Sequence, residues 1–268
     1  MSWLEIVVLA IVQGMTEFLP VSSSGHLILA PALLGWSDQG LAFDVAVHVG
    51  TLAAVVLYFR DDLTRMTVAF FGQFSTAQSD AARVDARLAG YLIAATIPAG
   101  IVGIVFRDAI EMYLRSPVII AATTAGFGVL LYLADRFGAQ RRTVEQMTWR
   151  DAVLVGIAQA AALVPGTSRS GVTMTMGMML GLSAKAAARF SFLLSIPVIV
   201  LAGGLEALKL VKDEAAVDWS ALLLGSVLSA VVAYLTIKFF LKFIANIGML
   251  PFMLYRFGLA VVILLALS

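Results

Sequence analysis

The chain has 268 residues, of which 61% are hydrophobic and only 13% are charged. Soluble domains carry about 25% charged residues, so this composition excludes a soluble globular protein and predicts an integral membrane protein. The net charge of +1 is spread over short loops, which excludes the basic stripe of a nucleic-acid-binding protein, and the absence of cysteine excludes disulfides and thiolate chemistry.

The chain begins with an apolar run, 3–12, that is too short to cross a bilayer. A polar loop follows, and after it comes a second short apolar run, 27–34. Eight helical residues rise only about 12 Å, whereas the hydrocarbon core is about 30 Å thick. We therefore interpret the pair as a re-entrant helix hairpin.

The same order of elements occurs twice. The first hairpin is followed by three long apolar runs, at 41–59, 88–106 and 117–134. Two short runs, 152–164 and 172–182, then flank a second polar loop, and three more long runs follow at 185–205, 219–240 and 251–268. The pattern predicts an all-α polytopic membrane protein with one domain, 1–268, built from two repeats, 1–134 and 151–268.

An odd number of spans in each repeat places the second repeat upside down relative to the first. Such inverted repeats bring their broken helices together near the midplane of the bilayer. The loops 60–87 and 135–150 hold four arginines each, more than 107–116 or 206–218, so we expect them to be cytoplasmic and both termini to lie outside the cytoplasm. Within the first of these loops, 72–87 is the segment that we expect to be irregular.

The first polar loop follows a helix that carries Gln13 and Glu17 on one face, because these residues are four apart. Its residues are Ser22, Ser23, Ser24, Gly25 and His26. We expect the next helix to start at about His26 or Leu27. A helix N-terminus after a loop rich in serine and glycine is an anion site, because free N–H groups point outward and the dipole favours negative charge.

The second polar loop has the same design, with an arginine added. It comprises Pro165, Gly166, Thr167, Ser168, Arg169, Ser170 and Gly171, and Gln159 lies nine residues before Ser168, as Gln13 lies nine residues before Ser22. Arg169 offers a permanent cation whose forked donors match phosphate oxygens. Two helix N-termini, an arginine and many hydroxyls predict a site for a polyanion such as a diphosphate.

Several of these residues have plainer interpretations. Glu17 could form a structural pair with the arginine of the second loop, although ionisable groups within a membrane usually mark function. Ser22 and Ser24 could be helix caps rather than ligands. We interpret His48, midway along the run 41–59, as an interhelical hydrogen-bond donor.

At these residues the sequence resembles a known family, the bacitracin-resistance type of undecaprenyl-diphosphate phosphatase. The similar segments are 13–26, 165–173, 190–197 and 251–257, and the match runs over essentially the whole chain. The resemblance implies hydrolysis of undecaprenyl diphosphate to undecaprenyl phosphate and inorganic phosphate, which recycles the lipid carrier of the cell wall and confers bacitracin resistance. It also implies a location in the bacterial inner membrane, a site open to the periplasm, and a homodimer.

Carried over by position, the resemblance implies that Glu17, His26 and Arg169 are essential and that Ser22, Ser23, Ser168, Ser170 and Thr173 surround the diphosphate. From the resemblance and the chemistry of the two loops together, the expected catalytic residues are Glu17, Ser23, His26 and Arg169. The expected diphosphate-binding residues are Gln13, Ser22, Ser24, Gly25, Gly166, Ser168, Ser170, Gly171 and Thr173. Some members of the family have a glutamate where this chain has Gln13, and the family pattern allows this variant.

Our mechanistic hypothesis makes Ser23 the nucleophile, with His26 as its base and then acid and Glu17 orienting the imidazole. Attack by His26 itself, or by water, stays open. The resemblance implies dependence on Mg²⁺ or Ca²⁺, but Glu17 and Asp44 are too few carboxylates for a dedicated cage. The alternative function is an anion transporter or lipid flippase, because inverted repeats with re-entrant hairpins are a transporter architecture.

Overall fold

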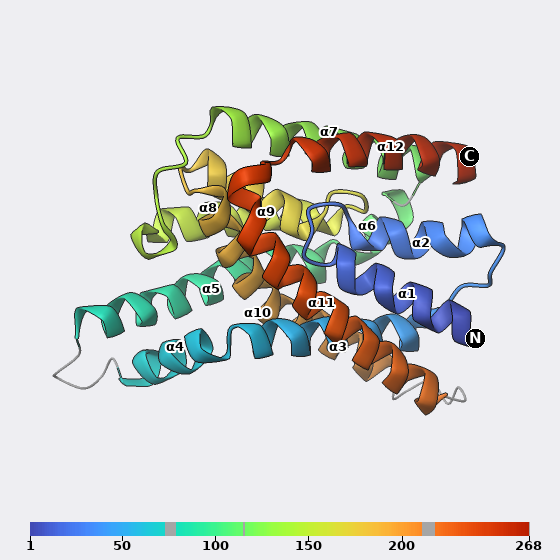
Figure 1. Ribbon diagram of the computed structural model, residues 1–268, viewed down its shortest axis with the longest axis horizontal. Helices are drawn as coiled ribbons and strands as arrows, with labels where there is room; N and C mark the ends of the chain where they lie inside the picture. Colours follow the sequence, from blue (N-terminus) through green and yellow to red (C-terminus); the bar gives the residue numbers. More distant parts are fainter. Residues whose placement is uncertain (73–78, 115, 211–217, 268) are drawn as a thin grey trace.

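A computed structural model of the chain describes residues 1–72, 79–114, 116–210 and 218–267 (Figure 1). These residues form α-helices and short 3-10 turns, and they contain no β-strand. Six helices are long and apolar enough to cross a membrane: α3 (Gly40–Tyr58), α5 (Asp80–Val105), α7 (Pro117–Phe137), α10 (Ala184–Leu210), α11 (Trp219–Ile247) and α12 (Leu250–Leu267). They confirm the six predicted spans, and the chain is an all-α, multi-pass membrane protein.

Four shorter helices form two pairs, α1 with α2 and α8 with α9, and the first pair is strongly apolar. Their bounds are Trp3–Thr16, Ser23–Leu34, Trp149–Ala160 and Arg169–Met179. The longest of the four, α1, has 14 residues and rises only about 21 Å, less than the thickness of a bilayer core. Their existence is confirmed, and their re-entrant placement in the membrane stays a prediction.

Helices of each half of the chain pack against helices of the other half. Helix α1 of the first half packs against α11 of the second half, and α8 of the second half packs against α5 of the first. The long helices α3 and α10 contact each other, as do α7 and α12. A two-fold relation between the halves would produce this pattern, and the division into inverted repeats stays a prediction that agrees with it.

Three local predictions are wrong. Helix α2 begins at Ser23 rather than at about His26, so the middle serine of the first loop is the first helical residue. The expected loop 107–116 contains a short helix, α6 (Arg107–Tyr113). Of the expected loop 72–87, residues 80–87 form the first turns of α5, while 73–78 lie outside the described residues.

The remaining connections carry α4 (Arg60–Gly72), η1 (Val144–Gln146) and η2 (Ala161–Leu163). Figure 1 places both termini at one end of the molecule, and α4, the start of α5 and the connection from α7 to α8 at the other end. The two arginine-rich stretches that we predict to be cytoplasmic therefore lie on the same side, opposite both termini.

Small residues let the helices around the site approach closely. A Cβ atom added to Gly50 of α3 would lie 2.2 Å from the backbone oxygen of Ser226 in α11. Nearby, the Ser229 hydroxyl donates to the Val47 carbonyl at 2.6 Å. In an apolar environment helix pairs are held by such close packing and hydroxyl bonds, so α3 and α11 form a rigid wall beside the first pair of short helices.

Candidate active site

The carboxylate of Glu17 is fixed by the residues on either side of it. Glu17 directly follows α1, and the Gln13 side-chain amide, one turn earlier, donates to its Oε2 at 3.1 Å. The next residue, Phe18, is fully buried and its ring meets that of Phe192 edge to face at 5.2 Å. The buried ring anchors the chain, so the short polar loop holds the carboxylate in one place.

The first loop turns sharply at Ser22 and delivers Ser23 to the carboxylate. Ser22 has φ of 72°, a left-handed conformation that is uncommon for residues other than glycine. Helix α2 begins at the next residue, and the Ser23 hydroxyl donates to Glu17 Oε2 at 2.9 Å. Ser23 thus stands at a helix N-terminus with its hydroxyl already bonded to a potential base.

The second loop repeats this turn. Ser168 has φ of 70°, α9 begins at the next residue, Arg169, and the Ser168 hydroxyl caps the helix by accepting from the Gly171 N–H at 3.2 Å. Gly166 has φ of 87°, and an added Cβ would lie 2.4 Å from the Ile120 oxygen, so only glycine fits there. The two loops therefore place Ser23 and Arg169 in equivalent positions, each as the first residue of its helix.

An ion pair joins the two loops at the centre of the site. One guanidinium nitrogen of Arg169, Nη2, donates to Glu17 Oε1 at 2.8 Å, and the other, Nη1, donates to the Ser191 carbonyl at 3.0 Å. The Ser170 hydroxyl makes a second link by donating to the Leu19 carbonyl at 2.9 Å. These contacts confirm the prediction that the two polar loops meet inside the protein.

A second arginine, Arg256 of α12, lies behind the loops and is fully buried. Its Nη1 donates to the Pro20 carbonyl of the first loop at 3.1 Å. Its Nη2 donates to the Gly166 and Thr167 carbonyls of the second loop, each at 3.0 Å. Five N–H donors in one planar group suit it to gather carbonyls from several segments, and here it ties both loops to the last helix.

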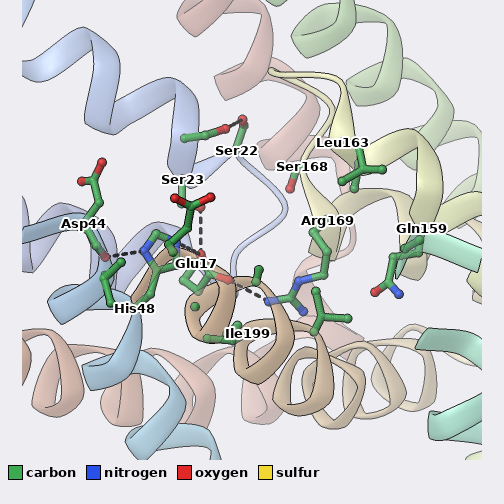
Figure 2. Close-up of a pocket in the computed structure, with 18 of the residues that line it drawn as sticks. Glu17, Ser22, Ser23, Asp44, His48, Gln159, Leu163, Ser168, Arg169 and Ile199 are labelled. Atoms are coloured by element: carbon green, nitrogen blue, oxygen red, sulfur yellow. Dashed lines mark hydrogen bonds and ion pairs between the residues drawn. The ribbon is translucent and has the colours of Figure 1, made fainter. Parts of the chain in front are cut away.

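The ion pair and Ser23 face a cavity of about 350 Å³. Figure 2 shows Glu17, Ser23 and Arg169 around this space, with His48 and Asp44 to one side of Glu17 and Gln159 beyond Arg169. Ser22, Ser24 and Ser168 also line it, and its apolar wall comes from α5, η2 and α10. Polar groups that converge at one side of an apolar pocket suit a ligand with a charged head and a hydrocarbon tail.

Several predicted ligands are buried beside the cavity rather than in its wall. They are Gln13, Gly25, Gly166, Ser170, Gly171 and Thr173. The Thr173 hydroxyl, for example, donates to the Ser191 hydroxyl at 2.7 Å and lies 2.9 Å from the Arg169 carbonyl. In this geometry these residues shape the loops, and direct contact between them and a diphosphate stays a prediction.

The structure does not bring His26 to Glu17, which corrects our expectation for this residue. His26 Nδ1 lies 2.7 Å from the Ser22 carbonyl, and Nε2 lies 2.6 Å from the Tyr255 hydroxyl. The His26 and Tyr255 rings are stacked, 5.6 Å apart, beside a separate apolar groove. The imidazole of His26 therefore faces Tyr255 and this groove instead of the cavity that Glu17 and Ser23 line.

His48, which we expect from the sequence to be only an interhelical hydrogen-bond donor, lies next to Glu17 in the structure. Its Nε2 is 3.7 Å from Glu17 Oε2, and it lines the cavity together with Asp44. Asp44 and His48 are four residues apart in an otherwise apolar span. Two polar residues on one face of such a helix indicate an inward-facing polar stripe, and that signal was available in the sequence.

The described residues do not fit a dedicated metal site. They contain no group of three or more histidine, aspartate or glutamate side chains placed to hold an ion. Both oxygens of Glu17 are engaged, one by Arg169 and the other by Ser23 and Gln13. Divalent ions such as Mg²⁺ and Ca²⁺ need several oxygen ligands, so no step of the chemistry below is assigned to a protein-held metal.

Comparison with known proteins gives full-length matches. The sequence model of the family described as "Bacitracin resistance protein BacA" matches residues 6–262. "Undecaprenyl-diphosphatase 2" of Stutzerimonas stutzeri is 58% identical, with 100% of this chain and 99% of that protein covered. "Undecaprenyl-diphosphatase" of Teredinibacter turnerae is 54% identical over 99% and 100% of the two chains, and that of Nitrosococcus oceani is 54% identical over 96% of each.

Proposed function

This chain belongs to the family of bacitracin resistance proteins, and we infer that it is a membrane phosphatase that hydrolyses undecaprenyl diphosphate to undecaprenyl phosphate and inorganic phosphate. The relatives that it matches over their whole length carry the name of this activity. The reaction recycles the lipid carrier of the cell wall, and bacitracin resistance follows from it.

The single observation that carries this inference is the meeting of Ser23, Glu17 and Arg169 at one wall of the cavity. A hydroxyl bonded to a carboxylate is an activated nucleophile. An arginine and two helix N-termini, all directed at the same place, stabilise the negative charge of a phosphoryl group in transfer. An anion carrier needs the second feature but has no use for the first.

We propose that Ser23 is the nucleophile. When the diphosphate enters, Arg169 exchanges its contact with Glu17 for phosphate oxygens, which frees the carboxylate to accept a proton. The Ser23 oxygen bonds to the terminal phosphorus, its proton passes to Glu17, and the bond from that phosphorus to the bridging oxygen breaks. Undecaprenyl phosphate leaves with the bridging oxygen and its electron pair.

Water completes the cycle. It attacks the phosphoserine, its hydroxide stays on phosphorus as inorganic phosphate, and its second proton returns to the Ser23 oxygen. The net reaction consumes one water and leaves one proton to be released. Ser23→Ala should abolish the trapped phosphoenzyme and turnover together, whereas phosphate release by this variant at the native rate would show that water attacks directly.

The first experiment measures inorganic phosphate released from a polyprenyl diphosphate by the purified protein, with Arg169→Ala as the matched variant. We expect release by the native chain and a loss of at least about 10²-fold in the variant, because Arg169 neutralises the developing charge. A folded native protein that binds the diphosphate without releasing phosphate would contradict the proposal and favour an anion carrier.

We propose that any Mg²⁺ or Ca²⁺ requirement is met by an ion that enters with the substrate, its ligands being mainly phosphate oxygens and water. Divalent ions bind diphosphates in this way in many phosphoryl-transfer sites. Excess EDTA should then slow turnover, and Mg²⁺ added together with the substrate should restore it. Undiminished turnover in EDTA would remove the ion from the mechanism.

We further propose that the protein lies in the bacterial inner membrane as a homodimer, with its cavity open to the periplasm. The cavity is lined by Leu41 near the start of α3 and Glu206 near the end of α10, and both termini lie outside the cytoplasm in the predicted orientation. A cysteine introduced at Ala139 should resist an impermeant reagent added to intact cells. Cross-linking in native membranes tests the dimer.

A further inference from the structure

His48 occupies a position in the cavity that the mechanism above leaves unused. It comes from the middle of α3, and its side chain is 33% exposed, whereas that of Glu17 is 9% exposed. Figure 2 shows the imidazole between Asp44 and Glu17, with Ser23 above the same carboxylate and Arg169 on the side opposite His48. The His48 side chain is also more exposed than that of Arg169, which is 14% exposed.

The hydrogen bonds of His48 determine which of its nitrogens can accept a proton. Nδ1 lies 2.7 Å from the backbone carbonyl of Asp44. A carbonyl oxygen only accepts, so Nδ1 carries a hydrogen, and in the neutral ring Nε2 is therefore the unprotonated nitrogen. Nε2 faces Glu17 Oε2 at 3.7 Å, which is the same oxygen that accepts from the Ser23 hydroxyl at 2.9 Å.

The other histidine of the chain is not placed for this task. The chain has two histidines. His26 donates from Nδ1 to the Ser22 carbonyl, so its Nε2 accepts from the Tyr255 hydroxyl, and both ring nitrogens are engaged away from the cavity. Within the described residues, His48 is thus the imidazole that borders Glu17.

We propose that His48 is a positioning residue for the phosphatase reaction: it takes, through Glu17, the proton that leaves Ser23 and releases it to solvent. The inference rests on the proposed function. The O–H bond of Ser23 breaks as its oxygen bonds to phosphorus, the proton moves to Glu17 Oε2 and then to His48 Nε2, and Glu17 returns to its charged form. This is the proton that the net hydrolysis releases.

The distance from Nε2 to Glu17 is long for a direct hydrogen bond, and catalytic contacts are often longer before the substrate binds. Departure of Arg169 toward the diphosphate leaves the carboxylate without its cation, which favours a shorter contact with an imidazole that is gaining charge. The other charged groups around the cavity are Asp44 on the same helix and Glu206 from α10.

The test compares pH–rate profiles for phosphate release by the native chain, His48→Gln and His26→Gln. A protonated His48 cannot accept a proton from Glu17, so kcat of the native chain should fall toward low pH. His48→Gln should remove this fall of kcat toward low pH, and it should lower kcat roughly 10-fold or more at high pH. His26→Gln should keep this fall toward low pH, because the ring nitrogens of His26 are engaged by the Ser22 carbonyl and the Tyr255 hydroxyl rather than by Glu17.

A fall of kcat toward low pH that persists in His48→Gln would overturn the proposal, whereas absence of phosphate release by the native chain would overturn the proposed function. A second measurement does not depend on the activity of His48→Gln. In the native protein with nitrogen-15 histidine, the signal missing from His26→Gln identifies His26, and the other belongs to His48. Addition of a non-hydrolysable polyprenyl methylenediphosphonate should make the His48 Nε2 signal shift with pH. A His48 signal that stays constant would also overturn the proposal.

Discussion

Replacement of Arg256 by methionine tests the idea that one buried guanidinium holds the two loops of the site together. Arg256 donates to carbonyls of five residues: Pro20, Thr123, Thr124, Gly166 and Thr167. The variant removes all of these donors and keeps much of the side-chain volume. Helix α12 itself should persist, because methionine is a good helix former.

The size of the effect depends on which carbonyls lose their partner. Thr123 and Thr124 lie inside α7, where the helix already supplies backbone donors, and the Gly166 carbonyl also accepts from the Thr124 hydroxyl at 3.3 Å. Pro20 and Thr167 are buried, and Arg256 donates to the carbonyl of each. A buried carbonyl left without a partner costs roughly 1–3 kcal/mol, so two of them cost about 2–6 kcal/mol.

Part of this cost is offset, because the variant no longer holds a charged group out of water. We therefore expect the free energy of unfolding to fall by about 2–4 kcal/mol and the apparent Tm by about 5–10 °C. Turnover should fall more steeply, since a displacement of about 1 Å in a reacting group can cost about 10²-fold. The assays are thermal unfolding in detergent, followed by tryptophan fluorescence, and phosphate release from polyprenyl diphosphate.

The matched control is Arg87→Met, which removes an exposed arginine from α5. Exposed substitutions of this kind change stability by less than about 0.5 kcal/mol, so this variant should unfold and turn over as the native chain does. If Arg256→Met shares both the Tm and the kcat of the control, the loops are held by other contacts and the reasoning is refuted.

Three further changes have expected outcomes that follow from single contacts. Glu17→Gln removes the proposed base and should lower kcat by about 10²–10⁴-fold in the phosphate assay; a smaller loss would exclude that role. Gly50→Ala, whose Cβ would meet a backbone oxygen at 2.2 Å, should destabilise by about 1–3 kcal/mol, whereas Gly100→Ala, which meets nothing within 4 Å, should be neutral or stabilising in thermal unfolding. Burial opposes ionisation of Asp151, but hydrogen bonds from Arg142 outweigh it and hold its pKa below the ordinary value, so the stability from this pair is present above about pH 4 and should be lost as the pH falls further; Asp151→Asn should flatten this acid limb in unfolding measured against pH.

The spans and the two polar loops could be predicted from the sequence because the bilayer imposes strict demands. A chain must supply about 20 apolar residues to cross it, and polar loops flanked by shorter runs must find partners inside the protein. From these two requirements we could predict all six spans and a contact between the loops, which Glu17 and Arg169 make in the structure.

The placement of the two histidines could not be predicted in the same way. His26 follows three serines and a glycine, so its position in the sequence suggested a place beside Ser23, but the early start of α2 turns it toward Tyr255. His48 reaches Glu17 only because α3 packs beside α1, a tertiary contact with no local signature apart from Asp44 one turn earlier. The role of Arg256 likewise depends on where α12 lies relative to both loops.

The two loops share one backbone design but carry different chemistry at the same position. In each, a serine in the left-handed region precedes a helix, and the next residue donates to Glu17: Ser23 in one case and Arg169 in the other. Neither loop could satisfy its polar groups alone in an apolar environment. The contacts that satisfy them, from Arg169 to Glu17 and from Ser170 to Leu19, are also the contacts that set the distance between nucleophile and cation. Stability and catalytic geometry therefore depend on the same few bonds, so substitutions that weaken the union of the loops should lower both together.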